Sequence, residues 1–395
     1  MLNFSSPDNL AFGQGITNHS MELERCKRFG FPYDDTRKTR RRIFFGSLIA
    51  DDSWHTILAH AIESYDLYHT VALIESNRTI NAHKAFFRKR IYESKSIELK
   101  ALKSGIFGSA TKVTVKFHVD NPAERESLYI WNGVEYQQRE VIVEIWKQNG
   151  MTKDDIGIVA DIDEFFSRDF LLAAQTCDIP EFRQGQDCKN PALTGFALIF
   201  EASPSCYWDR RGWGHPDVMS GECIDKIGDS KVHKPGLREW DGKGPRKNGY
   251  GDDLLNYTMM PNTTMYPLWT PNDFRLVLGK KYVRDETGVS AFHLHNFFSS
   301  LKILRNKYVT YGHPIYGADT KPLGDIHEDV KFTVNCLEGF EDDSNDVWMS
   351  STANYRTIPI LFKNSSYIEA RNKELREMMK EDKLRYEASS KSKQN

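Results

Sequence analysis

Three acidic residues follow an apolar run near the middle of the chain. The segment IVADIDE (158–164) places Asp161, Asp163 and Glu164 directly after buried-type residues. On a strand the side chains of Asp161 and Asp163 would project from the same face. Two neighbouring carboxylates repel each other unless a cation lies between them, and Mg²⁺ and Mn²⁺ prefer oxygen ligands. The segment therefore predicts a divalent-cation site at Asp161 and Asp163, and the group that such an ion serves best is a diphosphate.

Two other interpretations of this segment stay open. The aspartates could cap the helix that begins near Arg168, since an Asp-x-Asp triplet is short and common. Phosphatases also end a strand in Asp-x-Asp, with the first aspartate as nucleophile and the second as acid. They generally place it on the first strand and put a small hydroxyl residue two positions after the second aspartate, whereas here Phe165 and Phe166 follow and other strand–helix units come before. This order disfavours a phosphatase. Glu164 is a candidate catalytic base or a support for the metal ligands.

Polar residues also close the other predicted strands. Asp51 and Asp52 follow the first, and Glu75, Asn77 and Arg78 close the second. Because ligands of parallel α/β sheets bind at the carboxyl ends of the strands, we expect these residues to bind a donor substrate. Arg139 lies four residues after Glu135 on a predicted helix; the two form either a surface ion pair or a substrate clamp.

A third metal ligand is predicted at one of two histidines, His293 or His295. Two aspartates from one segment cover one side of a cation that takes about six ligands. His293 and His295 alternate with Phe292 and Leu294, so on a strand both histidines face one side. The alternative is that both are ordinary half-buried histidines bonded to the backbone.

The pattern of apolar residues predicts an α/β fold. Strands are expected at 43–50, 69–76, 112–118 and 154–166, and helices at 54–65, 83–103, 124–149 and 168–176. This alternation favours a single, mainly parallel sheet with helices on both faces. We expect an N-terminal arm (1–39), one catalytic domain (40–366) with a loop-rich acceptor region at about 177–290, and a polar C-terminal helix and tail (367–395).

Composition limits the class of protein. The 395 residues are 39% hydrophobic and 27% charged, which supports a packed core. A formal net charge of -2 argues against a general nucleic-acid binder. We expect no membrane segment, because no apolar run reaches 18 residues, and we find no readable signal peptide.

The six cysteines are too sparse for a disulfide scaffold and form no CxxC motif. Cys177–Cys188 and Cys206–Cys223 are possible bridges, and the sequence does not choose among the pairings. Asn-x-Ser/Thr sequons give weak support for a secretory route; they occur at Asn3, Asn18, Asn77, Asn256, Asn262 and Asn364.

Four ordered motifs resemble glycosyltransferase family 17, the family of β-1,4-mannosyl-glycoprotein N-acetylglucosaminyltransferases. They are RRIFFGSLIADD (41–52), VALIESNRT (71–79), EYQQRE (135–140) and IGIVADIDE (156–164), and the segment AFHLHNFF (291–298) is similar to a Gly-Trp-His segment of that family. The resemblance matches Asp161 and Asp163 to the family's acidic motif, Glu75 and Asn77 to its Glu-Ser-Asn, Arg139 to its Gln-Arg, and His293 to its histidine. Phe292 and Ala291 replace the Trp and Gly of that segment, and the match of its histidine implies His293, rather than His295, as the third metal ligand.

The resemblance implies a GT-A-like nucleotide-sugar-binding fold, UDP-N-acetylglucosamine as donor, a divalent cation (Mn²⁺ or Mg²⁺) and inversion at the anomeric carbon. The expected acceptor is a mannose of an N-glycan or glycoprotein, and the expected location is the Golgi or the lumen of the secretory pathway. The family's usual N-terminal membrane helix is not found in this chain. The alternatives are a catalytically inactive, glycan-binding relative and the phosphatase described above.

Overall fold

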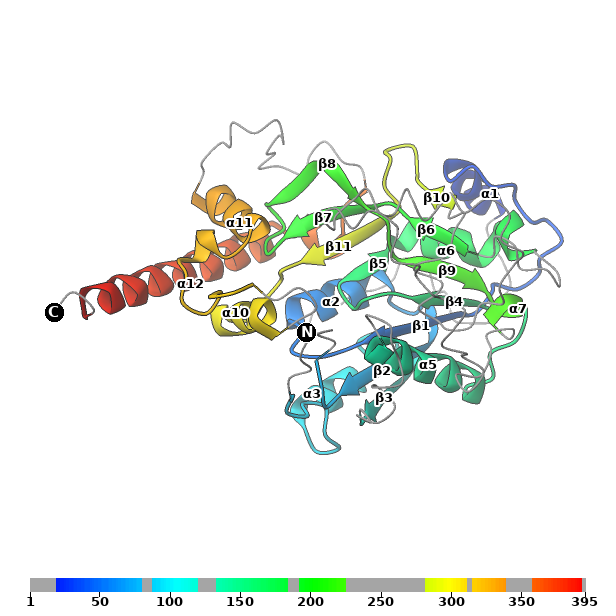
Figure 1. The fold of residues 1–395 in the computed structure, drawn as a ribbon. Helices are drawn as coiled ribbons and strands as arrows, with labels where there is room; N and C mark the ends of the chain where they lie inside the picture. Colours follow the sequence, from blue (N-terminus) through cyan, green and yellow to red (C-terminus); the bar gives the residue numbers. More distant parts are fainter. Residues whose placement is uncertain are drawn as a thin grey trace, which may run out of the picture.

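The computed structural model describes residues 19–79, 87–119, 133–183, 192–224, 281–310, 315–338 and 357–392. In these ranges the strands form two sheets (Figure 1). The large sheet contains β1 (Ile43–Leu48), β2 (Tyr68–Ser76), β3 (Lys112–His118), β4 (Ile156–Val159), β6 (Ala192–Gly195), β9 (Asp217–Ser220) and β10 (Lys281–Val283). The small sheet contains β5 (Glu164–Phe166), β7 (Ala197–Glu201), β8 (Tyr207–Trp213) and β11 (Ala291–His295).

Most neighbours in the large sheet are parallel. The strand order is β10-β6-β9-β4-β1-β2-β3. β1 pairs in parallel with β2 and β4, β2 with β3, and β10 with β6, whereas β9 runs antiparallel to both β4 and β6. The carboxyl ends of β1, β2 and β4 therefore meet at one edge of the sheet, where α/β proteins bind their ligands.

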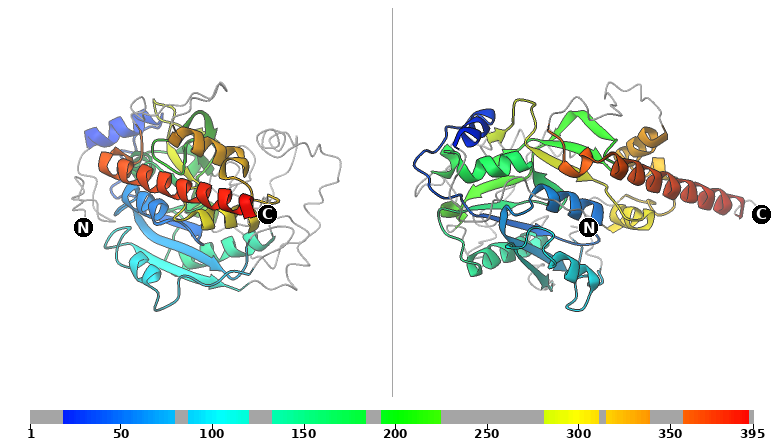
Figure 2. Two further views of the ribbon diagram at one scale, coloured as in Figure 1. Left: turned by 90° about the vertical axis from the view of Figure 1, so that its left-hand side faces the viewer. Right: turned by 180° about the vertical axis from the view of Figure 1, so that it is seen from behind.

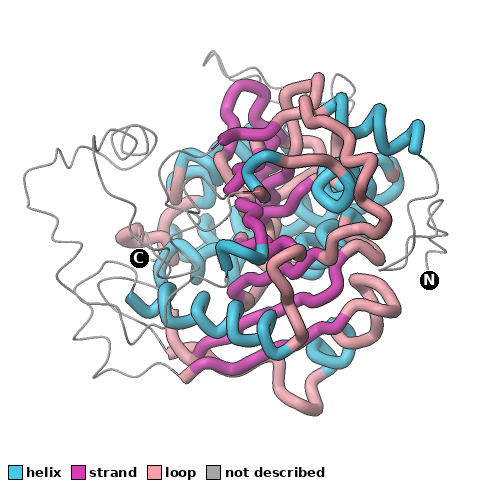
Figure 3. Tube along the Cα trace, turned by 90° about the vertical axis from the view of Figure 1, so that its right-hand side faces the viewer, coloured by secondary structure: helices cyan, strands magenta, loops and turns pink. Residues whose placement is uncertain are grey.

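Helices cover both faces of the large sheet, as the alternating pattern predicts (Figure 3). On one face α5 (Gly133–Gln148) packs Ile142 and Trp146 against Phe44 and Ile74. The other face buries residues of four helices in one apolar cluster. These helices are α1 (His19–Arg28), α2 (Trp54–Glu63), α3 (Ile97–Leu102) and α6 (Arg168–Thr176). The fold is thus α/β with a mixed, mostly parallel sheet.

The expectation of a single sheet is wrong. In the order of the sequence, each strand of the small sheet comes directly before or after a strand of the large sheet. β5 follows β4, β7 follows β6, β8 precedes β9 and β11 follows β10. The chain bends between the sheets at each of these places. Gly195 ends β6 where there is no room for a side chain, since an added Cβ would lie 2.8 Å from the Cβ of Ala291. Apolar runs such as 193–200 do not reveal these bends, because both halves are buried.

Most elements predicted from the pattern are present, with bounds that agree closely for β2, β3 and α6 and are shorter for the others. Three of the predicted strands correspond to β1, β2 and β3, and Ser53 caps α2 by accepting a hydrogen bond from the His55 N–H at 3.1 Å. The strand predicted at 154–166 is two strands, β4 and β5, joined by a turn. The helix predicted at 83–103 is reduced to α3, with residues 80–86 outside the described ranges. The helix predicted at 124–149 is described from residue 133 onward as α5.

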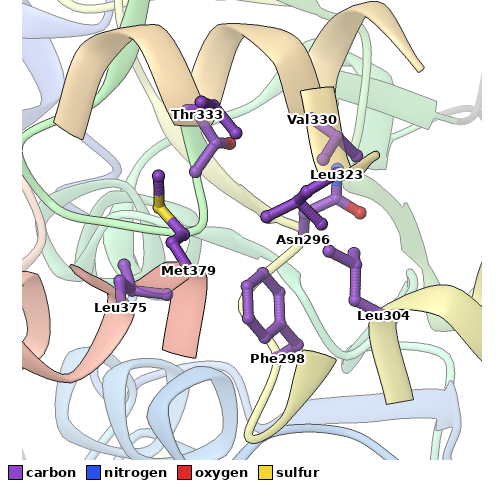
Figure 4. Close-up of a pocket in the computed structure, with 9 residues that line it drawn as sticks. Asn296, Phe298, Leu304, Leu323, Val330, Thr333, Leu375 and Met379 are labelled. Carbon is purple, nitrogen blue, oxygen red and sulfur yellow. The ribbon is translucent and has the colours of Figure 1, made fainter. Parts of the chain in front are cut away.

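The C-terminal elements pack at one end of the small sheet. They are α10 (Leu301–Thr310), α11 (Glu328–Glu338) and α12 (Ser365–Ser392), and α12 extends outward from the rest of the fold (Figure 2). Leu375 of α12 is fully buried. It borders a cavity of about 10 Å³ between these helices, which is space for a single water at most (Figure 4). No described helix is both long and apolar enough to cross a membrane.

The remaining helices of the described ranges are short: α7 (Gly221–Ile224), η1 (Pro180–Phe182), η4 (Leu323–Asp325) and η6 (Ile360–Lys363).

Two disulfides connect distant parts of the chain among the residues that the structure describes. Cys26 of α1 pairs with Cys177, and Cys206 pairs with Cys336 of α11. These pairings exclude both bridges considered from the sequence, Cys177–Cys188 and Cys206–Cys223. Nearness in sequence was a poor guide, because each bridge spans more than a hundred residues and depends on how the layers pack.

The sequons at Asn3, Asn18, Asn256 and Asn262 lie outside the described ranges, as does most of the expected acceptor region between 184 and 280.

Gly46 in β1 lies under α5, and we predict that Gly46→Ala destabilises the protein. An added Cβ would overlap the Cγ2 atom of Ile142 and lie 3.0 Å from the Trp146 ring. Overpacking of this kind costs about 1–3 kcal/mol. Gly324→Ala in η4 is the control, since its Cβ would meet nothing within 4 Å. Equal denaturant midpoints for the two variants would contradict this account of the α5 interface.

Candidate functional site

A cavity of about 790 Å³ lies where the carboxyl ends of β1, β2 and β4 face the small sheet. Its volume is in the range of small-molecule sites. Charged and aromatic side chains from both sheets and from α10 and α11 line it: Asp51, Asp52, Arg78, Arg88, Asp161, Asp163, Glu164, Glu201, Trp208, Trp213, His293, His295, Lys307 and Asp329.

The Asp161–Asp163 segment is a turn that joins the two sheets. The aspartates therefore do not share a face of one strand, as the sequence pattern suggests, although both line the cavity. The turn is fixed from both sides. The Leu294 N–H of β11 donates to the Asp163 carbonyl at 2.8 Å, and His60 Nδ1 of α2 lies 3.0 Å from the Ile162 carbonyl.

Arg139 holds Asp161 from beneath the cavity. Its Nη2 donates to Asp161 Oδ1 at 2.6 Å, and its Nε donates to Glu135 Oε1 at 2.9 Å. The Arg139 side chain is only 1% exposed and is not among the residues that line the cavity. The predicted ion pair with Glu135 exists, but it is not on the surface, and Arg139 is not placed to clamp a substrate. Its contacts make it a positioning residue for Asp161.

Glu164 supports the same turn. Its Oε2 accepts a hydrogen bond from the Asp161 N–H at 3.1 Å, and its Oε1 accepts one from Trp213 Nε1 at 2.7 Å. Both carboxylate oxygens are thus engaged inside the protein, and the residue is 1% exposed. A catalytic base must reach the proton that it removes, whereas the buried Glu164 carboxylate is tied to the turn and to Trp213. The geometry favours the supporting role, which the sequence left as the alternative.

Asp163 and His293 are neighbours. Asp163 Oδ2 lies 3.7 Å from His293 Nε2. Burial opposes ionisation of Asp163, but the His293 imidazole holds the pKa of that carboxyl below its usual range. Burial likewise opposes the charged form of His293, while Asp163 raises the pKa of the imidazole overall. His293 Nδ1 is buried and has no hydrogen-bond partner among the described residues. An aspartate oxygen and an imidazole nitrogen at this separation fit two ligands of a Mn²⁺ ion.

The predicted donor-binding residues divide into two groups. Asp51, Asp52 and Arg78 line the cavity, whereas Glu75 and Asn77 are not among its lining residues. The Glu75 carboxylate accepts hydrogen bonds from the backbone N–H groups of Ile91 and Tyr92, so it organises the chain after β2 rather than facing a ligand.

Asp52 is a donor-side carboxylate with a raised pKa. Its Oδ2 accepts a hydrogen bond from the Ala50 N–H at 2.6 Å. Burial raises its pKa to about 6, and the nearby charge of Asp163 adds to this.

A second group of ligating side chains lies in the cavity and was not identified from the sequence. Glu201 of β7, His295 of β11 and Asp329 of α11 form a set whose ligand atoms all lie within 4.8 Å of one another. Within the described residues the set of Asp161, Asp163 and His293 does not meet that spacing. Glu201 ends an apolar run, which is the one sequence signal that could have revealed it. Burial raises its pKa to about 8, and the charge of Asp329 adds to this.

No known protein-family model matches the chain, and no curated protein is significantly similar to it.

His60 should make the protein sensitive to acid. Burial lowers its pKa to about 3, whereas an unfolded histidine titrates near 6.5. As the pH falls, the unfolded chain therefore takes up a proton on His60 before the folded protein does. The contribution of His60 to the stability of the folded state is complete above about pH 6.5 and is lost as the pH falls toward 3. The slope from one such group is about 1.4 kcal/mol per pH unit.

We predict that His60→Asn reduces the slope of the unfolding free energy against pH between 6 and 4 by about this amount. Tyr68→Phe is the control, because it removes the hydroxyl that lies 3.0 Å from His60 Nε2 but keeps the imidazole. Urea denaturation at a series of pH values measures both variants. The same slope in His60→Asn as in the unsubstituted protein would show that His60 is not the group responsible.

Replacing Arg139 should leave the carboxylates of Glu135 and Asp161 without the guanidinium that pairs with both. Breaking a buried ion pair costs about 3–5 kcal/mol, and we expect Arg139→Met to fall at the low end, because Asp161 is 32% exposed. Lys116→Met is the matched control, since its partner Glu144 is 59% exposed and such surface pairs contribute about 0–1 kcal/mol. Chemical denaturation compares the two, and a loss below about 1 kcal/mol in Arg139→Met would contradict the positioning role.

Proposed function

We propose that this protein is an inverting, metal-dependent glycosyltransferase that uses a nucleotide-sugar donor. The observation that carries the proposal is the cavity at the carboxyl ends of β1, β2 and β4, where the Asp161–Asp163 turn and two arginines, Arg78 and Arg88, come together. Acidic residues that hold a divalent cation, together with cationic side chains, suit a diphosphate. A GT-A-like fold belongs to the same proposal.

The metal site of this proposal is built on Asp163 and His293, with Asp161 beside them. A bound Mn²⁺ or Mg²⁺ ion would offset the charge that develops on the departing diphosphate. Arg139 and Glu164 fix the turn, so that Asp163 presents its carboxylate without reorganisation. Arg78 and Arg88 line the donor side, where they can pair with phosphate oxygens.

The acceptor side is assigned to the small sheet. Trp208 and Trp213 line the cavity there, and indole side chains supply apolar surface against which a sugar can pack. Inversion requires a group that takes the proton of the acceptor hydroxyl as the new bond forms. Because both oxygens of Glu164 are engaged, this group is to be sought among the other carboxylates of the cavity.

The identity of the substrates rests on the sequence resemblance. On that ground we propose UDP-N-acetylglucosamine as donor and a mannose of an N-glycan or glycoprotein as acceptor, joined by a β-1,4 linkage. The Golgi or the lumen of the secretory pathway is the proposed location. The disulfides Cys26–Cys177 and Cys206–Cys336 support it, because such bonds persist in oxidising compartments.

A screen of UDP-sugars with an N-glycan acceptor, read out as UDP release with and without Mn²⁺, tests the proposal. We predict turnover that EDTA abolishes and that Asp163→Asn lowers at least about 100-fold, as expected when a metal ligand is disturbed. Asp154→Asn is the matched control, since Asp154 is exposed and precedes the same strand. Thermal unfolding checks that both variants fold.

Other outcomes would replace the proposal. Glycan binding without UDP release from any donor indicates an inactive, glycan-binding protein. A phosphoryl group on Asp161 and activity without a nucleotide sugar indicate the phosphatase. Full turnover in EDTA removes the metal from the mechanism.

A further inference from the structure

We propose that Glu201, His295 and Asp329 bind a second divalent transition-metal ion, separate from any ion at Asp163 and His293. The inference concerns metal binding by the protein itself and does not depend on the proposed reaction.

The spacing of the three side chains fits one ion. His295 Nδ1 lies 2.8 Å from Glu201 Oε1 and 3.7 Å from Asp329 Oδ2, and all three ligand atoms lie within 4.8 Å of one another. Ligand atoms that each lie about 2.1 Å from a common ion are separated by roughly 3–4.2 Å. Small side-chain rotations are therefore enough to close the site. Coordination through Nδ1 moves the imidazole proton to Nε2, so the neutral ring loses no net proton.

The strand register explains why these residues meet. β7 and β11 pair in parallel with His295 opposite Glu201, so the two side chains lie next to each other on one face. Phe292 and Leu294 occupy the other face and pack into an apolar cluster. Asp329 reaches this face from the first turn of α11.

The third ligand is held in place independently of any metal. The disulfide between Cys206 and Cys336 ties α11 to the chain between β7 and β8. Trp208 of β8 also stacks on Phe332 of α11 with ring centroids 3.9 Å apart. Asp329 is thus fixed relative to Glu201 before an ion binds, which lowers the ordering cost of binding.

The charge of the cluster also favours a cation. Glu201 and Asp329 place two carboxyl groups against the His295 imidazole, and their side chains are only 2% and 11% exposed. A second imidazole, that of His327, also lies next to Asp329, with its Nδ1 3.3 Å from Asp329 Oδ2. Lys307 approaches the cluster through Asn296, whose Oδ1 accepts from the lysine at 3.1 Å while its Nδ2 donates to Glu201 at 3.3 Å. Two buried carboxylates need compensation in a medium of low dielectric constant.

The donor set indicates the class of ion. One imidazole nitrogen and two carboxylate oxygens suit Mn²⁺, Zn²⁺ or Co²⁺ better than Ca²⁺ or Mg²⁺, which prefer oxygen alone. The His293 and His295 ring centroids are 5.3 Å apart, so the two ions would lie side by side in the same cavity.

Mn²⁺ binding to the nucleotide-free, full-length protein tests the inference, with free Mn²⁺ measured by its electron paramagnetic resonance signal. We predict two ions per chain. His295→Gln and Asp329→Asn should each weaken one of them at least about tenfold and leave the other in place. Asp163→Asn should weaken the other ion instead. Asp325→Asn, at an exposed position in η4, is the control and should keep both.

Three results would overturn the inference: two ions that persist in both His295→Gln and Asp329→Asn, a single ion lost in Asp163→Asn and His295→Gln alike, or no Mn²⁺, Zn²⁺ or Co²⁺ binding at all. Circular dichroism identifies a variant that fails to fold, and the other variant then decides. A protein that binds two ions but releases no UDP would contradict the proposed function and leave this inference standing.

Discussion

The turn between β4 and β5 is the constraint on which the candidate site depends. The chain leaves the large sheet after Val159 and enters the small sheet at Glu164, so the turn belongs to neither sheet. The Leu294 N–H fixes it to β11, and His60 fixes it to α2. A backbone held on two sides presents its carboxylates in one orientation, which is the preorganisation that metal and phosphate sites need.

The four crossings between the sheets also create the cavity. A single parallel sheet offers a shallow edge at its carboxyl ends, whereas a second sheet facing that edge encloses a volume with polar groups on both sides. The arrangement gathers many acidic groups in one place, and the negative charge of each must be offset by a neighbouring group. Arg139 does so for Asp161, His293 for Asp163 and His327 for Asp329. The disulfide Cys206–Cys336 keeps α11, which carries Asp329, in place.

Several predicted ligand-binding residues instead support others. Glu75 caps backbone N–H groups, Arg139 pairs with Asp161, and Glu164 holds the turn. Each is an ionisable residue near a strand end, and the residue type alone does not separate a group that faces a ligand from one that orders the backbone behind it. A buried carboxylate or guanidinium needs partners, and the protein supplies them from nearby backbone and side chains. Whether such a residue faces a ligand or orders the backbone depends on the side of the strand end on which its hydrogen-bond and ion-pair partners lie.

The sequence by itself determined the layer type and the position of the acidic segment after a buried strand, although not that this segment is a turn. Local periodicity and caps follow from neighbouring residues, so β1, β2, β3 and α2 could be predicted, and so could the face shared by His293 and His295. The second sheet could not be predicted, because the bends interrupt apolar runs that are buried on both sides of the break. The cluster of Glu201, His295 and Asp329 and both disulfides join segments far apart in the chain, so only the packing of the two sheets and α11 brings them together.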